Sequence, residues 1–377
     1  MLKFGRHLAR KWSFAVAYKR CSAWLLVEGS GQRFSSQPTE KRYEQHSDPA
    51  LGGSMSDSAR RGRRRPNARA QQSLRRPTPE AYSTRTIEFD SDGETCVGTL
   101  YLPADIDTPP VVVMAPGLGM WRSFVLPAVA ERFAAAGFAA FVFDFRHHGD
   151  SEGEPRGLAD PHKQIADYEA AIETMIDTDA VDSNRLVLWG YSFSGGHVLS
   201  VAADEFRIAG VIATAPFVDG RQELRRSLRQ PKRFLRSTLA GLRDAVGTKV
   251  GRGHEVRLVA EPGEFAVLTA PGARRAILDA VDRDSDWVNR LPARIFLALP
   301  SYRPITTVEE IRCPALVIGG SHDQIVPAEG PAAAADRIPE STYIELPADH
   351  MSVFDADFEA VVGHQLTFLR ATVDHRQ

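Results

Sequence analysis

Ser192, in a glycine-rich turn, is the residue of this chain that is best placed to do chemistry. Residues 185–196 read RLVLWGYSFSGG, an apolar strand that runs into a tight turn with this serine at its tip. A strand that turns sharply into a helix, called a nucleophile elbow, holds a serine hydroxyl above the edge of a sheet. Because backbone segments approach closely there, small residues are needed two positions before and after the serine. Gly190 fits the first position, and Ser194 stands at the second, where glycine is usual.

A serine hydroxyl becomes a useful nucleophile only when a base takes its proton and a third group orients that base. Two later strands end in suitable residues: Asp323 follows an apolar strand at 315–318, and His350 follows a strand at 343–346. The chain order Ser, Asp, His is that of one large class of serine hydrolases. Asp323 could instead serve only as a helix N-cap, and Asp349 is a weaker candidate because it is adjacent to His350.

An acyl-transfer site also needs two N–H groups that stabilise the developing oxyanion. The residue after the nucleophile, Phe193, supplies one of them. The second is expected from the glycine-rich loop 116–120, PGLGM, which follows an apolar strand at 111–115. We predict Leu118 as this donor and Gly119 as the alternative, while a plain tight turn is the non-functional interpretation. His322 and His364 lack a partner pattern and are predicted to be structural.

The elements that must position these residues alternate along the chain from about residue 85. Continuous apolar strands separated by helices indicate a mostly parallel sheet covered by helices on both faces. A hairpin is expected first, followed by buried strands and amphipathic helices. The predicted strands are 84–89, 94–102, 111–115, 138–145, 186–189, 208–214, 315–318 and 343–346, and the predicted helices are 124–136, 160–176, 194–203 and 354–371.

Between about residues 217 and 311 this alternation stops. The segment begins with apolar residues at helical spacing and arginines at the other positions. We predict a helical insertion above the carboxyl edge of the sheet, with the apolar helix face turned toward Ser192 and the arginines mostly solvated. An alternative is that some of the arginines attract an anionic substrate or a lipid surface. The apolar positions are Leu224, Leu228, Leu235, Leu239, Leu242 and Val246.

Taken together, these motifs resemble the α/β-hydrolases of the esterase, lipase and serine-aminopeptidase type. The resemblance implies an eight-stranded α/β-hydrolase sheet, with a core at 81–216 and 312–377 and a cap insertion at 217–311. It also implies Ser192 as the nucleophile, His350 as general base and then acid, and Asp323 as its orienting carboxylate. The family often has His-Gly in the oxyanion loop where this chain has Pro-Gly, which leaves a backbone donor intact.

The stretch 144–153, DFRHHGDSEG, resembles the D-x-R-G-H-G-x-S loop of the same family, with His147 where glycine is usual. In that family the loop is mainly structural. A histidine pair also suggests a metal site, but no carboxylate or third ligand follows at a regular spacing. We therefore expect no metal and no cofactor.

The function that these features predict is hydrolysis of carboxylic esters of small molecules through an acyl-enzyme. Peptidase or amidase activity, thioester cleavage and acyl transfer use the same three residues and stay open. Serine at the elbow argues against dehalogenases and epoxide hydrolases, which use aspartate, and against dienelactone hydrolases, which use cysteine. A non-catalytic binding protein would be expected to have lost a member of the triad.

Composition separates the first 80 residues from the rest. They carry 17 Lys and Arg against 6 Asp and Glu, while residues 81–377 carry 29 against 42. We predict a disordered basic tail that is dispensable for hydrolysis. Its start could be a transit peptide, or Met55 could be the true initiator. The acidic body argues against nucleic acid. Three scattered cysteines and no apolar run of membrane-spanning length predict a cytoplasmic protein without an integral membrane segment, and leave its oligomeric state open.

Overall fold

The computed structural model describes residues 81–374. The predictions for the basic tail, the transit peptide and Met55 lie outside the described residues. Within them, no helix is long and apolar enough to cross a membrane.

An eight-stranded sheet forms the centre of the described region, with strand order β1-β2-β4-β3-β5-β6-β10-β11. β2 pairs antiparallel with both β1 and β4, and every other pairing in this sheet is parallel, so the predicted mostly parallel sheet is confirmed. The strands are β1 Tyr82–Ser91, β2 Glu94–Pro103, β3 Pro110–Ala115, β4 Ala139–Phe143, β5 Asp182–Tyr191, β6 Gly210–Thr214, β10 Ala315–Gly320 and β11 Ser341–Leu346.

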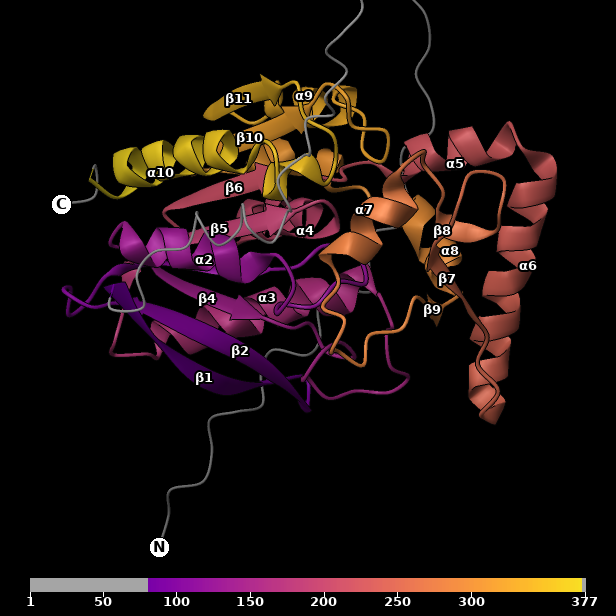
Figure 1. Ribbon diagram of the computed structural model, residues 1–377, viewed down its shortest axis with the longest axis horizontal. Coiled ribbons are helices and arrows are strands. Elements are labelled where there is room, and N and C mark those ends of the chain that lie inside the picture. The colour runs from indigo at the N-terminus through magenta and orange to yellow at the C-terminus, as the bar shows by residue number, and fades with distance from the viewer. Residues whose placement is uncertain (1–80, 375–377) are drawn as a thin grey trace, which may run out of the picture. The chain divides into compact units, whose positions relative to one another are not determined.

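Helices cover both faces of this sheet, as predicted (Figure 1). α3 (Pro161–Ile176), α4 (Phe193–Asp204) and α9 (Glu329–Ala335) bury one face, and α2 (Leu126–Ala135) and α10 (Phe358–Asp374) bury the other. Alternate residues of β3 contribute to the two separate apolar cores, because successive strand side chains point to opposite faces. A run of consecutive apolar residues is therefore required in each central strand.

Local sequence sets where α3 begins. The Asp160 side chain accepts hydrogen bonds from the backbone N–H groups of His162 and Lys163, and Pro161 occupies the first helical position. An aspartate at this position satisfies N–H groups that lack a helical acceptor, and proline suits the first helical position because it has no N–H to satisfy.

The segment between β6 and β10, which we call the cap segment (217–311), lies beyond one end of the sheet (Figure 1). It contains the predicted helices and also a three-stranded sheet of order β8-β7-β9, which the sequence did not suggest. Its elements are α5 Gly220–Leu228, α6 Pro231–Gly247, β7 Glu255–Val259, β8 Ala266–Leu268, α7 Ala273–Ala280, β9 Leu291–Pro292 and α8 Ile295–Ala298. Short 3-10 turns are η2 Thr248–Val250, η3 Leu299–Ser301, η4 Pro304–Thr306, η5 Val308–Glu310 and, near the C-terminus, η6 Ser352–Phe354.

The predicted orientation of the apolar helix face is wrong. Leu228, Leu235, Leu239, Leu242 and Val246 are exposed rather than turned toward Ser192. The helix packs inward through small residues instead, with Ala240 and Gly241 buried. A Cβ added at Gly241 would lie 2.8 Å from Leu297 Cγ, so α6 and α8 approach too closely for a larger side chain at this point.

Candidate active site

Ser192, His350 and Asp323 come together at the carboxyl ends of β5, β11 and β10. His350 Nε2 lies 2.9 Å from Ser192 Oγ, and His350 Nδ1 lies 2.6 Å from Asp323 Oδ2. An ionised carboxylate can only accept, so the ring carries its proton on Nδ1, and Nε2 then accepts from the serine hydroxyl. Both His350 and Asp323 are buried, which keeps water from competing for these bonds.

The turn at Ser192 is held in a strained conformation. Its backbone has φ 58° and ψ −115°, values that residues with a side chain seldom adopt. Its backbone N–H donates to Thr214 O and its carbonyl accepts from Phe217 N–H, each over 2.9 Å. A Cβ at Gly190 would lie 2.3 Å from the Ser194 carbonyl oxygen, so the tight turn requires glycine at this position.

Ser194, the departure from the usual glycine, has a structural explanation. Its hydroxyl donates to Ala115 O over 2.8 Å and accepts from Tyr191 N–H over 2.9 Å. It therefore ties the end of β3 to the turn after β5 and satisfies two buried backbone groups. The Ser194 side chain is completely buried, so its hydroxyl has a structural role and is not exposed to the cavity.

Asp323 combines the two interpretations that its sequence allowed. Its Oδ1 accepts from the backbone N–H groups of Ile325 and Val326, each over 2.8 Å, in the manner of a cap. Its Oδ2 remains for His350. The two backbone donors fix the carboxylate plane and leave one oxygen directed at the imidazole. Asp349, in contrast, accepts from Met351 and Ser352 N–H and shapes its own loop.

Leu118 and Phe193 border the same cavity as Ser192. Phe193 is the first residue of α4, where the backbone N–H has no acceptor within the helix. Among the described residues the Leu118 N–H also has no acceptor. Gly119, the alternative, takes φ +67°, and its carbonyl accepts from Trp287 Nε1 over 2.8 Å.

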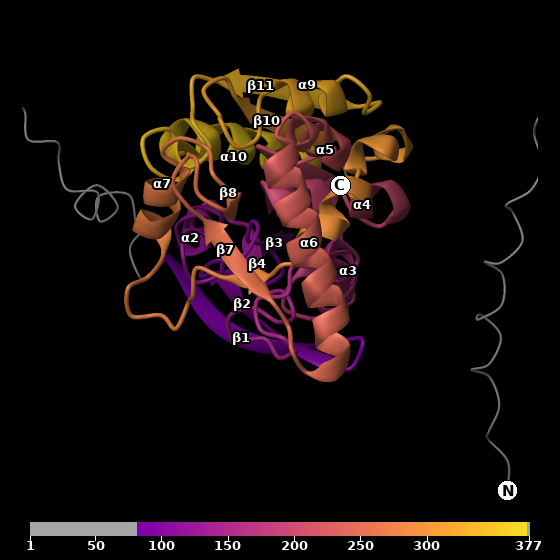
Figure 2. The same cartoon turned by 90° about the vertical axis from the view of Figure 1, so that its right-hand side faces the viewer.

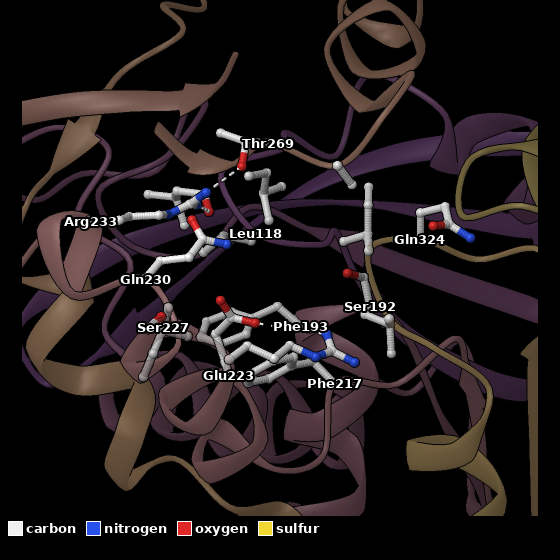
Figure 3. A pocket seen from close by; sticks show the side chains of 17 residues that line it. Leu118, Ser192, Phe193, Phe217, Glu223, Ser227, Gln230, Arg233, Thr269 and Gln324 are labelled. Atoms are coloured by element: carbon white, nitrogen blue, oxygen red, sulfur yellow. Dashed lines mark hydrogen bonds and ion pairs between the residues drawn. The ribbon is translucent and has the colours of Figure 1, made fainter. Parts of the chain in front are cut away.

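The cavity has a volume of about 310 Å³ and is lined by both the core and the cap segment. Its wall near Ser192 is largely apolar, with contributions from Leu118, Phe193 and Phe217. The wall from α5 and α6 is polar (Figure 3). On that side Arg233 donates to Thr269 Oγ1 over 2.6 Å, and Arg226 lies 3.9 Å from Glu223. The remaining polar residues of this wall are Ser227 and Gln230.

Tyr191 supports the histidine in a way that the sequence did not reveal. Its hydroxyl donates to the His350 carbonyl over 2.5 Å, and the two rings lie 4.9 Å apart. Burial raises the pKa of this phenol well above its usual value, so it stays a neutral donor. No sequence signal indicated this role, because an aromatic residue before the serine is also explained by core packing.

A second buried polar group lies beneath the elbow. Tyr302 Oη lies 2.7 Å from His197 Nδ1, whose Nε2 lies 3.0 Å from Gln164 Oε1. Burial lowers the pKa of His197 to about 3, so this imidazole is neutral. These residues come from α3, α4 and the end of the cap segment. No sequence pattern predicted that these three elements would lie in contact.

The stretch 144–153 is structural, as the resemblance implied. Asp144 accepts from Arg122 N–H over 2.7 Å, and the buried Arg146 guanidinium bonds Asp167 over 2.5 Å. His147 has φ 70°, which explains why glycine suits its position. Within residues 81–374 no group of three or more His, Cys, Asp or Glu residues is arranged to hold a metal ion.

The sequence of this chain matches a known family of enzymes. Residues 107–347 match the family described as "Serine aminopeptidase, S33". The chain belongs to this α/β-hydrolase family. This match spans the cap segment as well as most of the sheet, and ends just before His350. This S33 family member is therefore a hydrolase by fold and by sequence.

Proteins of different described functions are similar to this chain. "Quorum-quenching protein AidA" of Acinetobacter baumannii is 36% identical over 289 residues, 76% of this chain and 94% of the relative. A "Thiohydrolase" of Eupenicillium brefeldianum is 26% identical over 313 residues, 78% of this chain and 96% of the relative. The crystal structure of "Alpha/beta hydrolase GrgF from Penicillium sp. sh18" has a TM-score of 0.67 at 26% identity, covering 77% of this chain and 99% of that one.

Proposed function

We propose that this S33 family member is a serine hydrolase that cleaves carboxylic esters of small molecules through an acyl-enzyme. The observation that carries the proposal is the continuous hydrogen-bonded chain from Ser192 through His350 to Asp323, at the wall of a cavity that can hold an acyl group.

In the first half of the reaction, Ser192 Oγ attacks the ester carbonyl carbon while His350 Nε2 takes the hydroxyl proton. The negative oxygen that forms accepts from the N–H groups of Leu118 and Phe193. His350 then gives its proton to the departing alcohol, and the acyl group stays on Ser192. In the second half, His350 takes a proton from water, the resulting hydroxide attacks the acyl carbon, and the free acid leaves with Ser192 reprotonated. Apart from the ester and water, these steps use only side chains and backbone of this chain, so no cofactor is needed.

The two walls of the cavity suggest the form of the substrate. The apolar wall near Ser192 suits an aliphatic or aromatic acyl group. The polar wall of Ser227 and Gln230 suits a hydroxyl, carbonyl or amide group at the far end of the substrate. An amphiphilic acyl compound fits this arrangement better than a plain hydrocarbon ester.

Thioester cleavage is the second candidate, and the specific support for it is the thiohydrolase among the relatives. The quorum-quenching relative extends the candidate substrates to small signal molecules with a hydrolysable acyl bond. Peptide cleavage, which the family description names, uses the same residues.

The test compares three substrate types on one enzyme preparation: p-nitrophenyl esters of rising chain length, the matching acyl thioesters, and amino-acid p-nitroanilides. We expect esters to give the highest kcat/KM and Ser192→Ala to abolish turnover of all three. Faster cleavage of the anilides would overturn the ester assignment, and faster cleavage of thioesters would favour the second candidate. Full activity of Ser192→Ala would overturn both.

A further inference from the structure

The outer side of α5, α6 and the turn η2 that follows them carries a line of aliphatic side chains that are about half exposed or more. Figure 2 shows α6 facing the viewer along its whole length, with β7 and β8 to its left. The exposed fractions run from 48% at Leu242 to 71% at Val250, far more than a helix in a globular core leaves open. We call this line the apolar stripe, and it consists of Leu228, Leu235, Leu239, Leu242, Val246 and Val250.

The stripe is not the face by which α6 packs on the rest of the protein, because a different face of this helix makes that contact. Ala240 and Gly241 are buried against the rest of the cap segment. Asp244 is also buried, and it accepts from Arg294 Nε over 2.7 Å and from His254 N–H over 2.8 Å. These bonds fix the rotation of the helix, so the leucines on its other side cannot turn inward without breaking them.

The stripe is bordered by positive charge. Residues 221–252 contain ten Lys and Arg but two acids, Glu223 and Asp244. Asp244 is held by Arg294, and Glu223 lies near Arg226. The rest of residues 81–377 is acidic, so the excess of positive charge is confined to residues 221–252. Eight exposed basic side chains of residues 221–252 form no ion pair with a carboxylate among residues 81–374: Arg221, Arg225, Arg229, Lys232, Arg236, Arg243, Lys249 and Arg252.

We propose that α5 and α6 dock this protein onto the surface of an anionic lipid bilayer. The apolar stripe enters the boundary between headgroups and acyl chains, and the bordering Lys and Arg residues pair with lipid phosphates. A helix with leucines on one face, basic residues beside them and little net hydrophobicity is the form that binds in the plane of a membrane. The 17 residues of α6 give a straight contact about 25 Å long.

The charge and composition of this surface favour an anionic bilayer over a second copy of the chain, residues 1–80 or another protein. A second copy of the chain would bring two sets of arginines together across a two-fold axis, where they repel. Residues 1–80 are themselves strongly basic and are repelled in the same way. Protein interfaces are anchored mainly by Trp, Tyr and Arg in pockets, whereas the stripe is purely aliphatic and lies on a convex helix. An anionic bilayer complements both its charge and its shape.

Docking would also affect the candidate active site, although it does not depend on the proposed function. Glu223, Arg226 and Arg233 of the same two helices line the cavity that contains Ser192. A bilayer held against their outer side places the cavity close to a phase in which amphiphilic compounds concentrate.

The experiment is flotation of the full chain with vesicles of phosphatidylcholine alone or mixed with equal phosphatidylglycerol. We expect flotation only with the mixed vesicles. Leu239→Ser combined with Leu242→Ser should weaken partitioning at least about tenfold. Phe206→Ser combined with Val288→Ser is the matched control, because those side chains are 60% and 61% exposed elsewhere, and it should float like the unaltered chain. Leu239→Phe combined with Leu242→Phe should float at least as well.

Several outcomes would overturn the proposal. Equal flotation of the leucine-to-serine variant would show that charge alone, including that of residues 1–80, binds the vesicles. Absence of flotation of the unaltered chain would exclude lipid docking. If sedimentation then showed a dimer that the serine variant converts to a monomer, the stripe would be an interface between copies. Circular dichroism and melting of each variant confirm that it is folded.

Discussion

The sheet core and the cap segment bury their apolar residues according to different rules. In the core, β3, β4 and β6 have every residue buried, and two apolar clusters fill the opposite faces. In the cap segment, α6 buries alanine, glycine and an aspartate, and leaves its leucines exposed. A continuous apolar run between helices has only the interior to occupy. The apolar face of an amphipathic helix can pack on the protein's own core or on another surface, and the sequence pattern alone does not distinguish the two.

The same contrast applies to the polar residues. In the core, Ser194, Tyr191 and Asp323 each satisfy specific backbone groups and fix the elbow and the histidine. In the cap segment most arginines on α5 and α6 are exposed without acidic partners in the described part of the chain. Substitutions in the core should therefore have large effects, and substitutions along the outer side of the cap segment should have small ones.

The largest effect is expected from Ser192→Ala. Removing the proposed nucleophile should lower kcat for the best ester about 10⁴-fold or more, while the melting temperature stays within about 2 °C. Steady-state assays and calorimetry measure the two quantities. A variant that retains substantial activity would show that a different group attacks the substrate.

The buried histidines of the core predict an acid-sensitive fold. Burial lowers the pKa of His148 to about 4 and that of His197 to about 3, below the value of about 6.5 in the unfolded chain. Between pH 6.5 and about 4 the unfolded chain thus binds more protons, and stability falls as pH falls, by about 1.4 kcal/mol per pH unit for each histidine. Denaturant unfolding at successive pH values measures this slope.

His197→Gln is the matched variant for that experiment, because glutamine keeps a polar partner for Tyr302 and does not titrate. The slope of its stability against pH should be smaller than that of the unaltered chain over the same range. An unchanged slope would mean that other groups cause the acid sensitivity.

Ser194→Ala should produce a moderate loss of stability. Without the hydroxyl, Tyr191 N–H and Ala115 O lose their buried partner, which costs about 1–3 kcal/mol of the free energy of unfolding. Chemical denaturation of this variant beside Ser192→Ala separates a structural serine from the candidate nucleophile. Equal stability of the two variants would contradict the role given to Ser194.

The smallest effects are expected on the outer side of the cap segment. Leu239→Ser combined with Leu242→Ser should change the free energy of unfolding by less than about 1 kcal/mol, since these side chains are already exposed. Arg225→Ala combined with Arg229→Ala should leave kcat/KM for soluble esters within about twofold, with little dependence on salt. A loss of several kcal/mol in the leucine variant would mean that the helix face is buried after all.

Sequence patterns indicated the core elements of this chain better than they indicated contacts between distant segments. The mostly parallel sheet, the elbow and the Ser192, Asp323 and His350 loops follow from apolar runs, glycines and chain order, whereas the order of the strands was not predicted. Tyr191 and the contacts among Tyr302, His197 and Gln164 could not be predicted, because they join residues that only the folded sheet brings together. The exposed face of α6 was missed because the small inner residues, Ala240 and Gly241, give a weaker signal than leucine.

The central claim is that Ser192 is the nucleophile of an acyl-transfer reaction. Peptide mass spectrometry after treatment with a fluorophosphonate tests it most directly, because this reagent reacts with a serine activated by a neighbouring base. We expect a single covalent adduct on Ser192, which an ester substrate prevents and which is absent from His350→Ala. An adduct on another residue, or no adduct on a folded protein that hydrolyses esters, would contradict it.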